Sequence, residues 1–402
     1  MSPDPVHAAR RWIHRAPRIS VLALFSWVAW ACDTSHPPPF GDPGEPLPDL
    51  TADQLARFEA GRSLFDSDIS PELGLGPTFN QQRCSSCHDV PTLGGSGVER
   101  VLRITRWEDG RCDPLTEVGG DNVQPRVTDI YRELGGAGEA IPAAATHTVD
   151  MVAPSLYGIG LIEEIPAAAI LSREDPNDTD GNGVSGRAGR TASGELARFG
   201  QKGSDATVRD FVQGALLQEM GITTAAHPRD LSVNGEPLPP DADPAPDPEF
   251  GAEQVDLLVD YLRLLAPPRP LAADSVGPDV GEGRRTFQEI GCENCHTARF
   301  VTAADAPAPL AGQLLPLYSD LLLHDMGPQA AGICSPSASP TEVRTAPLMG
   351  LRHRPILTHD GRASTLLDVI EGHGGEAQGS AAAFATLSDR RRTALLRFLS
   401  TL

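Results

Sequence analysis

The chain has 402 residues, of which 40% are apolar and 22% charged, so it is long enough to bury a sizeable core and to form two domains. It contains 40 Gly and 37 Pro, which interrupt regular structure too often for long helices to dominate. Acidic residues exceed basic residues by 54 to 33. This balance argues against a nucleic-acid partner, because nucleic acid is bound through clustered positive charge, and it favours a basic protein partner.

The first 31 residues have the features of an export signal. A run of arginines precedes an apolar segment, Ile19 to Ala31, that is too short to cross a bilayer as a mature helix. Two cleavage patterns compete: Ala29-Trp30-Ala31 fits simple secretion, and Ala31-Cys32 resembles a lipoprotein signal in which Cys32 carries lipid. We expect a periplasmic or cell-envelope protein whose only membrane contact is such an anchor, with residues 33–50 as a Pro-rich tether.

Two similar segments come next along the chain. A short helix predicted over Glu59–Phe65 precedes the run Cys84-Ser85-Ser86-Cys87-His88. A second, over Gly281–Phe287, precedes Cys292-Glu293-Asn294-Cys295-His296. Both runs are C-x-x-C-H, the attachment motif of c-type haem, in which two thiols add to the haem vinyl groups and the histidine supplies the proximal nitrogen.

Other uses of paired cysteines do not explain the two histidines. A thioredoxin-like redox pair or a structural zinc site uses C-x-x-C, but neither requires a histidine directly after both pairs. The motifs therefore predict two covalently bound haem c groups. Their thioether cysteines are Cys84, Cys87, Cys292 and Cys295, and their proximal ligands are His88 and His296.

The two halves match beyond the haem motifs, which indicates a duplicated unit. A Pro-centred turn follows each motif, at Ala153–Gly158 and at Ala346–Gly350. Each half then ends in a predicted amphipathic helix, over Glu253–Ala266 and over Ser388–Leu402, the second with Ser388 as its N-cap. Residues 267–280 are the expected linker between the halves.

Further motifs carry a resemblance to a known family. They are Gly74–Asn80, Gly158–Pro166, Asp178–Arg187, Tyr318–Gly327, Arg344–Leu348 and His359–Ala363. With them, the chain after about residue 50 resembles the di-haem oxidoreductase family of peroxidases, which is related to the bacterial di-haem cytochrome c peroxidases. The resemblance implies a mainly α fold of two cytochrome c-like domains in tandem with long loops, over 51–268 and 278–402.

The resemblance also implies a division of labour between the two haems. Electrons from a small redox protein or a quinol-linked donor would pass through the C-terminal haem and reduce hydrogen peroxide at the N-terminal haem. Two alternatives use the same motifs: an electron-transfer cytochrome without peroxidase activity, and a di-haem oxidase of a protein or another substrate. Only the peroxidase and the oxidase need an exchangeable position on one iron.

The resemblance places the sixth ligand of the C-terminal haem fourteen residues after the histidine of the His-Asp-Gly motif. Counting from His359 gives His373, where the related peroxidases usually have methionine. Two histidine ligands would give this haem a lower potential than a His/Met pair. Met326 and Met349 are the alternatives at this position, each also explained by core packing.

The N-terminal haem is the expected peroxide site, which needs a group that moves a proton between the peroxide oxygens. Glu163 and Glu164 follow a Gly-rich turn and are the candidate catalytic residues, with a surface position or an arginine partner as the alternative. His147 or Met151 would be the sixth ligand of a resting form. Trp107 is the candidate electron relay between the haems, with buried packing as the alternative.

Asp178, Asp180 and Asn182 alternate before Gly183, as at the start of a calcium loop. The loop lacks the glutamate of a complete EF-hand, and the related peroxidases bind calcium near the haem interface. An ordinary Asx-rich turn explains the same residues, so both interpretations stay open.

Two histidines and two cysteines lie outside the sites described so far. His324 and His359 lie in family motifs and are interpreted as packing residues or contacts of the haem propionates, not as iron ligands. Cys112 and Cys334 are outside the haem motifs. In an oxidising compartment they could pair, but their separation along the chain does not decide this.

Overall fold

The computed structural model describes residues 38–272 and 277–402, and these belong to one compact unit. The expected export signal and Cys32 lie outside the described residues. Of the described residues, 31% are helical and 14% lie in strands or bridges, so more than half form turns and loops. The expectation of a mainly helical, loop-rich protein is confirmed at this level. Within the same residues, we find no helix of the length and apolarity that a membrane span requires.

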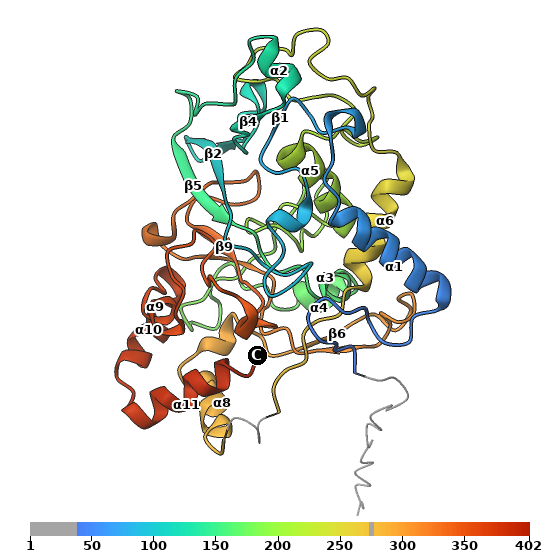
Figure 1. Cartoon of the computed structure of the whole chain (residues 1–402). Coiled ribbons are helices and arrows are strands. Elements are labelled where there is room, and N and C mark those ends of the chain that lie inside the picture. Colours follow the sequence, from blue (N-terminus) through green and yellow to red (C-terminus); the bar gives the residue numbers. More distant parts are fainter. Residues whose placement is uncertain (1–37, 273–276) are drawn as a thin grey trace, which may run out of the picture. The chain divides into compact units, whose positions relative to one another are not determined.

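The elements are short, as the Gly and Pro content predicts. The helices are α1 Ala52–Phe65, α2 Asp129–Glu133, α3 Ile159–Glu163, α4 Ala167–Leu171, α5 Val208–Met220, α6 Ala252–Leu264, α8 Val280–Glu289, α9 Leu366–Glu371, α10 Gln378–Ala385 and α11 Asp389–Leu399. The strands are β1 Thr78–Phe79, β2 Arg100–Glu108, β3 Arg111–Asp113, β4 Arg126–Val127, β5 His147–Val152, β6 Phe300–Val301, β7 Leu314–Leu315, β8 Leu323–Asp325 and β9 Glu342–Arg344. The largest sheet has the order β3-β2-β5, and all its strands are antiparallel (Figure 1).

In the first half, α1 lies across α6, the helix predicted to close that half. A capping box of Thr51 and Gln54 starts α1 by satisfying free amides of its first turn. The two helices approach so closely that a Cβ at Gly61 of α1 would lie 2.0 Å from the carbonyl oxygen of Leu257 in α6. Only glycine permits this crossing.

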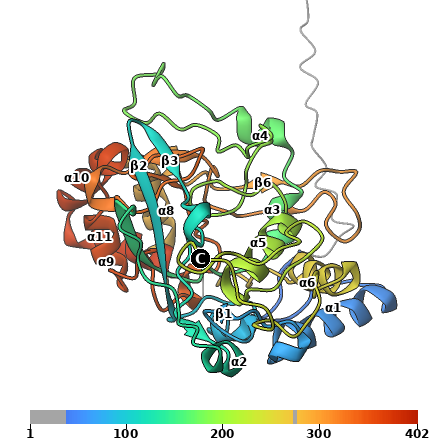
Figure 2. The ribbon, with the colours of Figure 1, turned by 90° about the horizontal axis from the view of Figure 1, so that it is seen from above.

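The second half repeats this arrangement with α8 and α11, which lie side by side in both views (Figures 1 and 2). A Cβ at Gly283 of α8 would lie 2.1 Å from the carbonyl oxygen of Ala394 in α11. Ser388 caps α11, as predicted, by accepting a hydrogen bond from the Arg391 amide. The duplicated helix pair inferred from the sequence is thus present in both halves.

The halves share a core and are cross-linked. The strands β6 and β7 of the second half pack into the main core of the first half through Phe300 and Leu315. A disulfide joins Cys112 of β3 to Cys334, with Cα atoms 5.7 Å apart, so the pairing left open by the sequence does occur. The boundaries 51–268 and 278–402 stay a prediction, because the described residues separate into no further units.

The expected tether over residues 33–50 is wrong for its described part. The amide of Leu47 donates to the carbonyl of Leu264 at 2.8 Å, and the amide of Ala266 donates to the carbonyl of Glu45 at 3.0 Å. The Leu47 side chain is buried in the core beside the end of α6. This Pro-rich segment therefore packs as an extended strap, because its few apolar residues find a surface that composition alone does not reveal.

Candidate functional site

A single cavity of roughly 960 Å³ connects the two haem motifs. It is lined by the cysteines and histidines of both, namely Cys84, Cys87, His88, Cys292, Cys295 and His296. Its other walls come from α5, from the loop over 198–205, and from the segment of the second half between β9 and α10. Residues that are distant in the sequence thus face one interior space.

The N-terminal motif presents its histidine for iron binding. Cys84–Ser86 form a short 3-10 helix, and His88 follows it. Its Nδ1 lies 3.1 Å from the carbonyl oxygen of Gly95, so Nδ1 carries the hydrogen and Nε2 is left as a lone-pair donor. Burial lowers the pKa of His88, which favours the neutral ring that a metal requires. The Phe65 ring packs against it at 6.2 Å.

The C-terminal motif has the same geometry. Nδ1 of His296 lies 2.9 Å from the carbonyl oxygen of Tyr318, and Phe287 packs at 6.3 Å. Burial lowers the pKa of His296 to about 4, with smaller contributions from nearby groups. Both motifs therefore offer one imidazole nitrogen whose tautomer and orientation are fixed by a backbone carbonyl.

The four motif cysteines are half-buried thiols, and none is in a disulfide. Burial raises the pKa of Cys84, Cys87 and Cys292 to about 12. A dithiol that exchanges disulfides needs a lowered pKa, so these pairs do not have the properties of a thioredoxin-like site. They suit stable thioether attachment.

Two buried arginines of the second half give the cavity an anion-binding character. Arg344 and Arg354 both line it, and burial lowers the pKa of each to about 10. Arg344 donates to the carbonyl of Gly200, and Arg354 donates to the carbonyls of Pro347 and Met349. The Nε of Arg354 is buried without a partner. Haem carries two propionates, so these guanidiniums fit the group that the motifs imply.

The second histidine of the C-terminal site lines the cavity as expected. Nδ1 of His373 lies 2.6 Å from the carbonyl oxygen of Val369, which leaves Nε2 available. It is close enough to His296 to affect the pKa of that residue. Met326 and Met349 also line the cavity, so the choice of His373 as the sixth ligand stays a prediction.

The structure does not place Glu163 and Glu164 in the lining of the cavity, so their predicted catalytic role gains no support from it. Glu163 accepts from the amide of Val208 at 2.7 Å and pairs with Nε of Arg263 at 3.1 Å, and Glu164 pairs with the same guanidinium. Neither carboxylate is among the described residues that line the cavity. The arginine pairing that the sequence left as an alternative explains both, since each negative charge is used to hold α5 and α6.

A different group of carboxylates faces the cavity near the N-terminal motif. Asp121, Asp205 and Glu219 surround Arg103, and all four line the cavity. Asp121 accepts from Arg103 at 2.8 Å, whereas Glu219 lies 3.8 Å from the guanidinium. Burial raises the pKa of Asp205 and of Glu219, and Arg103 lowers it only in part. These residues have no motif, because β2, a loop and α5 bring them together only in the fold.

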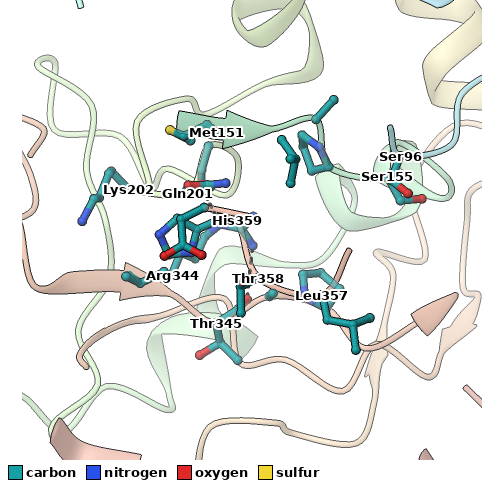
Figure 3. A pocket seen from close by; sticks show the side chains of 18 of the residues that line it. Ser96, Met151, Ser155, Gln201, Lys202, Arg344, Thr345, Leu357, Thr358 and His359 are labelled. Carbon is teal, nitrogen blue, oxygen red and sulfur yellow. Dashed lines mark hydrogen bonds between the residues drawn. The ribbon is translucent and has the colours of Figure 1, made fainter. Parts of the chain in front are cut away.

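The expected electron relay, Trp107, and one expected resting ligand, His147, lie outside the lining of the cavity. Trp107 lies on β2 opposite Cys112, and His147 begins β5 with its ring against the Thr146 hydroxyl. Neither is among the described residues that line the cavity. Met151 does line it, where β5 runs past Gln201 and His359 (Figure 3). Trp107 therefore lies in the β2-β3 hairpin outside the lining of the cavity, and its relay role stays a prediction.

The acidic loop keeps both of its interpretations. Ligand atoms of Asp178 and Asp180 lie within 4.8 Å of each other and of Asp175, which the sequence pattern did not include. Asn182 instead donates its side-chain amide to Asp180 at 2.9 Å. Asp180 accepts from the amide of Asn182 at 3.1 Å, as in an Asx turn. The calcium site stays a prediction.

Of the two interpretations of His324, packing or a propionate contact, the structure supports packing, because the side chain is buried and both of its ring nitrogens have carboxylate partners. Nε2 lies 2.9 Å from Asp320 and Nδ1 lies 2.8 Å from Glu376. Its four-residue spacing from Asp320 was a readable signal, whereas the contact with Glu376 was not. His359 lines the cavity beside Arg344, where a propionate contact remains open to it (Figure 3).

The chain is similar to one known family and, weakly, to several solved structures. No curated protein matches the chain. Among the solved structures that match, hydrazine synthase of Kuenenia stuttgartiensis has a TM-score of 0.41 and 15% sequence identity, over 96% of this chain and 100% of that chain. A MauG-like protein associated with microbial copper homeostasis has a TM-score of 0.41 and 16% identity, over 93% of this chain and 94% of that chain. The diheme peroxidase BthA of Burkholderia thailandensis has a TM-score of 0.42 and 16% identity, over 86% of each chain.

These structural likenesses are weak, and the assignment does not depend on them. A family profile described as "Di-haem oxidoreductase, putative peroxidase" matches residues 148–402, which is more than half of the chain. The matched part contains the second haem motif, the His-Asp-Gly motif and His373. The chain belongs to the di-haem oxidoreductase family, and the family implies two haems.

Proposed function

We propose that this protein is an exported di-haem c-type cytochrome peroxidase. Electrons enter at the C-terminal haem, held by Cys292, Cys295 and His296, and reduce hydrogen peroxide at the N-terminal haem, held by Cys84, Cys87 and His88. One observation carries the proposal: the same cavity has a second histidine at the C-terminal site and buried carboxylates at the N-terminal site.

The C-terminal site is suited to electron transfer. His296 and His373 each have Nδ1 bound to a backbone carbonyl and each face the cavity. His296 and His373 would hold one haem iron between them, and an iron so held would supply electron transfer without binding a substrate. Their pre-oriented rings need no rearrangement when the charge of the iron changes.

The N-terminal site is suited to proton movement. Peroxide reduction delivers electrons from the haem and protons from the protein, and the departing oxygen must be protonated. Asp205 and Glu219 hold their protons more strongly than exposed carboxyls because burial raises the pKa of each. A group poised nearer to neutral pH gives and takes a proton efficiently. We assign these two residues the role that the sequence pattern gave to Glu163 and Glu164.

An electron-transfer cytochrome is the second candidate. Met151 and Met220 line the N-terminal side of the cavity, and a thioether bound there would close the exchangeable position. The protein would then carry electrons without peroxide chemistry.

The electron donor is proposed to be a small redox protein or a quinol-linked donor outside the cytoplasm. The net charge of −21 favours a donor with a basic surface. Nothing in the charge pattern suits nucleic acid.

The test is a pyridine haemochrome count followed by steady-state peroxide reduction with a reduced small cytochrome as donor. We expect two covalent haems per chain and turnover that saturates with peroxide. Two haems without turnover would support the electron carrier, and fewer than two haems would contradict the proposal.

A further inference from the structure

His324 occupies a closed hydrogen-bonded network in the second half. It lies on β8 with a side chain only 2% exposed. Nε2 lies 2.9 Å from Oδ2 of Asp320, and Nδ1 lies 2.8 Å from Oε2 of Glu376. One buried imidazole is thus held between two carboxylates that come from different elements.

The geometry fixes the charge of the ring. A carboxylate only accepts hydrogen bonds, so both nitrogens of His324 must donate, and the ring is an imidazolium. Burial alone would lower the pKa of His324, but hydrogen bonds to Asp320, Cys295 and Glu376 raise it to about 12. The pKa of Glu376 is lowered to about 2, against the effect of its burial, by hydrogen bonds from His324, Ser185 and the Asp325 amide.

The network contacts both sides of the C-terminal haem site. Nδ1 of His324 lies 3.7 Å from Sγ of Cys295, the attachment cysteine beside His296. The amide of Asp320 donates to the carbonyl of Cys295 at 2.8 Å. Glu376 follows His373 by three residues, so the same imidazolium holds the segment that carries the expected sixth ligand.

A loop of the first half completes the network. Ser185 donates to Glu376 through its amide at 2.9 Å and through its hydroxyl at 2.8 Å. A Cβ at Gly186 would lie 2.7 Å from Cε1 of His324, so the loop passes directly over the ring. Backbone hydrogen bonds between Arg187 and Leu323, at 3.1 and 2.8 Å, fix its register on β8.

We propose that His324 is a positioning residue that joins the attachment and ligand segments of the C-terminal haem site and, through its fixed positive charge, sets the reduction potential of that haem. The inference rests on the proposed function for the presence of the haem. The inference adds a separate claim. The positive charge of His324 lies beside Cys295 and controls the reduction potential of this haem, although His324 neither binds the iron nor donates a proton to substrate.

The test compares two substitutions that keep shape and change charge in opposite directions. His324→Gln removes a positive charge and leaves the charges of Asp320 and Glu376 uncompensated beside the site, so the midpoint potential of the C-terminal haem falls. Glu376→Gln removes a negative charge, so the same potential rises. Spectroelectrochemical titration measures both haems, and the potential of the N-terminal haem stays unchanged in each variant.

Glu342→Gln is the matched control. Glu342 is a partly buried carboxylate of the same half that pairs with Arg187, and it is not among the described residues that line the cavity. Its substitution leaves both potentials unchanged. If His324→Gln fails to fold, Asp320→Asn replaces it and must raise the potential as Glu376→Gln does.

Two outcomes separate this inference from the proposed function. Two covalent haems whose potentials stay unmoved, or move in the same direction in His324→Gln and Glu376→Gln, overturn the inference alone. Fewer than two covalent haems in the unsubstituted protein overturn the proposed function and this inference together. Opposite shifts confined to the C-terminal haem support it.

Discussion

The two haem-binding halves have the same scaffold and different chemistry. Each has a glycine at its helix crossing, a phenylalanine beside the proximal histidine, and a carbonyl on Nδ1 of that histidine. The segments after the motifs differ: the first half brings Asp205 and Glu219 to the cavity, and the second brings His373. On the proposed function, the shared scaffold attaches both haems, and the segments after the motifs decide what each haem does.

The charged residues around the two sites also differ: carboxylates predominate at the first and arginines at the second. Three carboxylates share one arginine beside the N-terminal motif. Arg344 and Arg354 of the second half line the cavity and donate only to carbonyls. Negative charge stabilises the more oxidised, more positive iron, so we expect the N-terminal haem to tolerate high oxidation states better.

The largest expected difference between the two halves follows from removing the proximal ligand of one haem at a time. His88→Gly removes peroxide turnover and leaves the low-spin signal of the C-terminal haem. His296→Gly removes that low-spin signal and slows turnover by cutting off the electron supply. Electron paramagnetic resonance and peroxide kinetics measure both effects, and interchanged results would reverse the roles of the two haems.

Removing the carboxylates of the first half is expected to lower turnover without removing haem. Asp205→Asn with Glu219→Gln lowers kcat for peroxide by about 10²-fold or more, because the departing oxygen loses its proton source. Glu163→Gln is the control: it lowers stability by about 1–3 kcal/mol through its contact with Arg263 and leaves kcat unchanged. A larger kinetic effect at Glu163 than in the double variant would restore the catalytic role that the structure argues against.

Changing the second histidine sharpens the contrast at the C-terminal haem. His373→Met raises the midpoint potential of that haem alone, because methionine ligation favours the reduced iron. A potential titration with both haems resolved checks this. No shift in His373→Met, together with a shift in Met349→Leu, would transfer the ligand role to Met349.

The pH dependence of stability is expected to have the same sign at one buried group of each half, but to begin at a different pH. The pKa of His324 is raised from 6.5 to about 12, so its contribution is complete below pH 6.5 and is lost as pH rises toward 12. The pKa of Glu219 is raised by burial, so its ionisation destabilises the fold as pH rises above its ordinary value of 4.5.

Thermal unfolding at several pH values tests these signs. The deficit of His324→Gln relative to the unsubstituted protein is largest at low pH and shrinks above pH 6.5. Glu219→Gln is more stable than the unsubstituted protein at neutral pH, and the advantage disappears in acid. A stability, relative to that of the unsubstituted protein, that falls as pH rises in either variant would contradict these charge states.

Local patterns predicted the scaffold well. The helices before the two motifs, the helices that close the two halves and the Ser388 cap all rest on short-range signals, and each is present as expected. Glu163 and Trp107 lie outside the lining of the cavity, where short patterns did not place them, because their surroundings are set by long-range packing against Arg263 and by the β2-β3 hairpin.

The remaining site residues had no readable spacing. Asp205 and Glu219 meet Arg103 only through the packing of a loop and α5 on β2. The link from Glu376 to His324 spans 52 residues, and that from Arg344 to the Gly200 carbonyl spans 144. Such pairings are chosen by the fold, so charge and burial reveal them only in three dimensions.

The most direct test of the difference between the two sites is the electron paramagnetic resonance spectrum of the fully oxidised and the half-reduced protein, with and without peroxide. We predict one low-spin signal from a site with two histidine ligands that peroxide leaves unchanged, and a second signal, from the N-terminal haem, that peroxide alters. Two low-spin signals that peroxide leaves unchanged in both states would contradict an exchangeable N-terminal site.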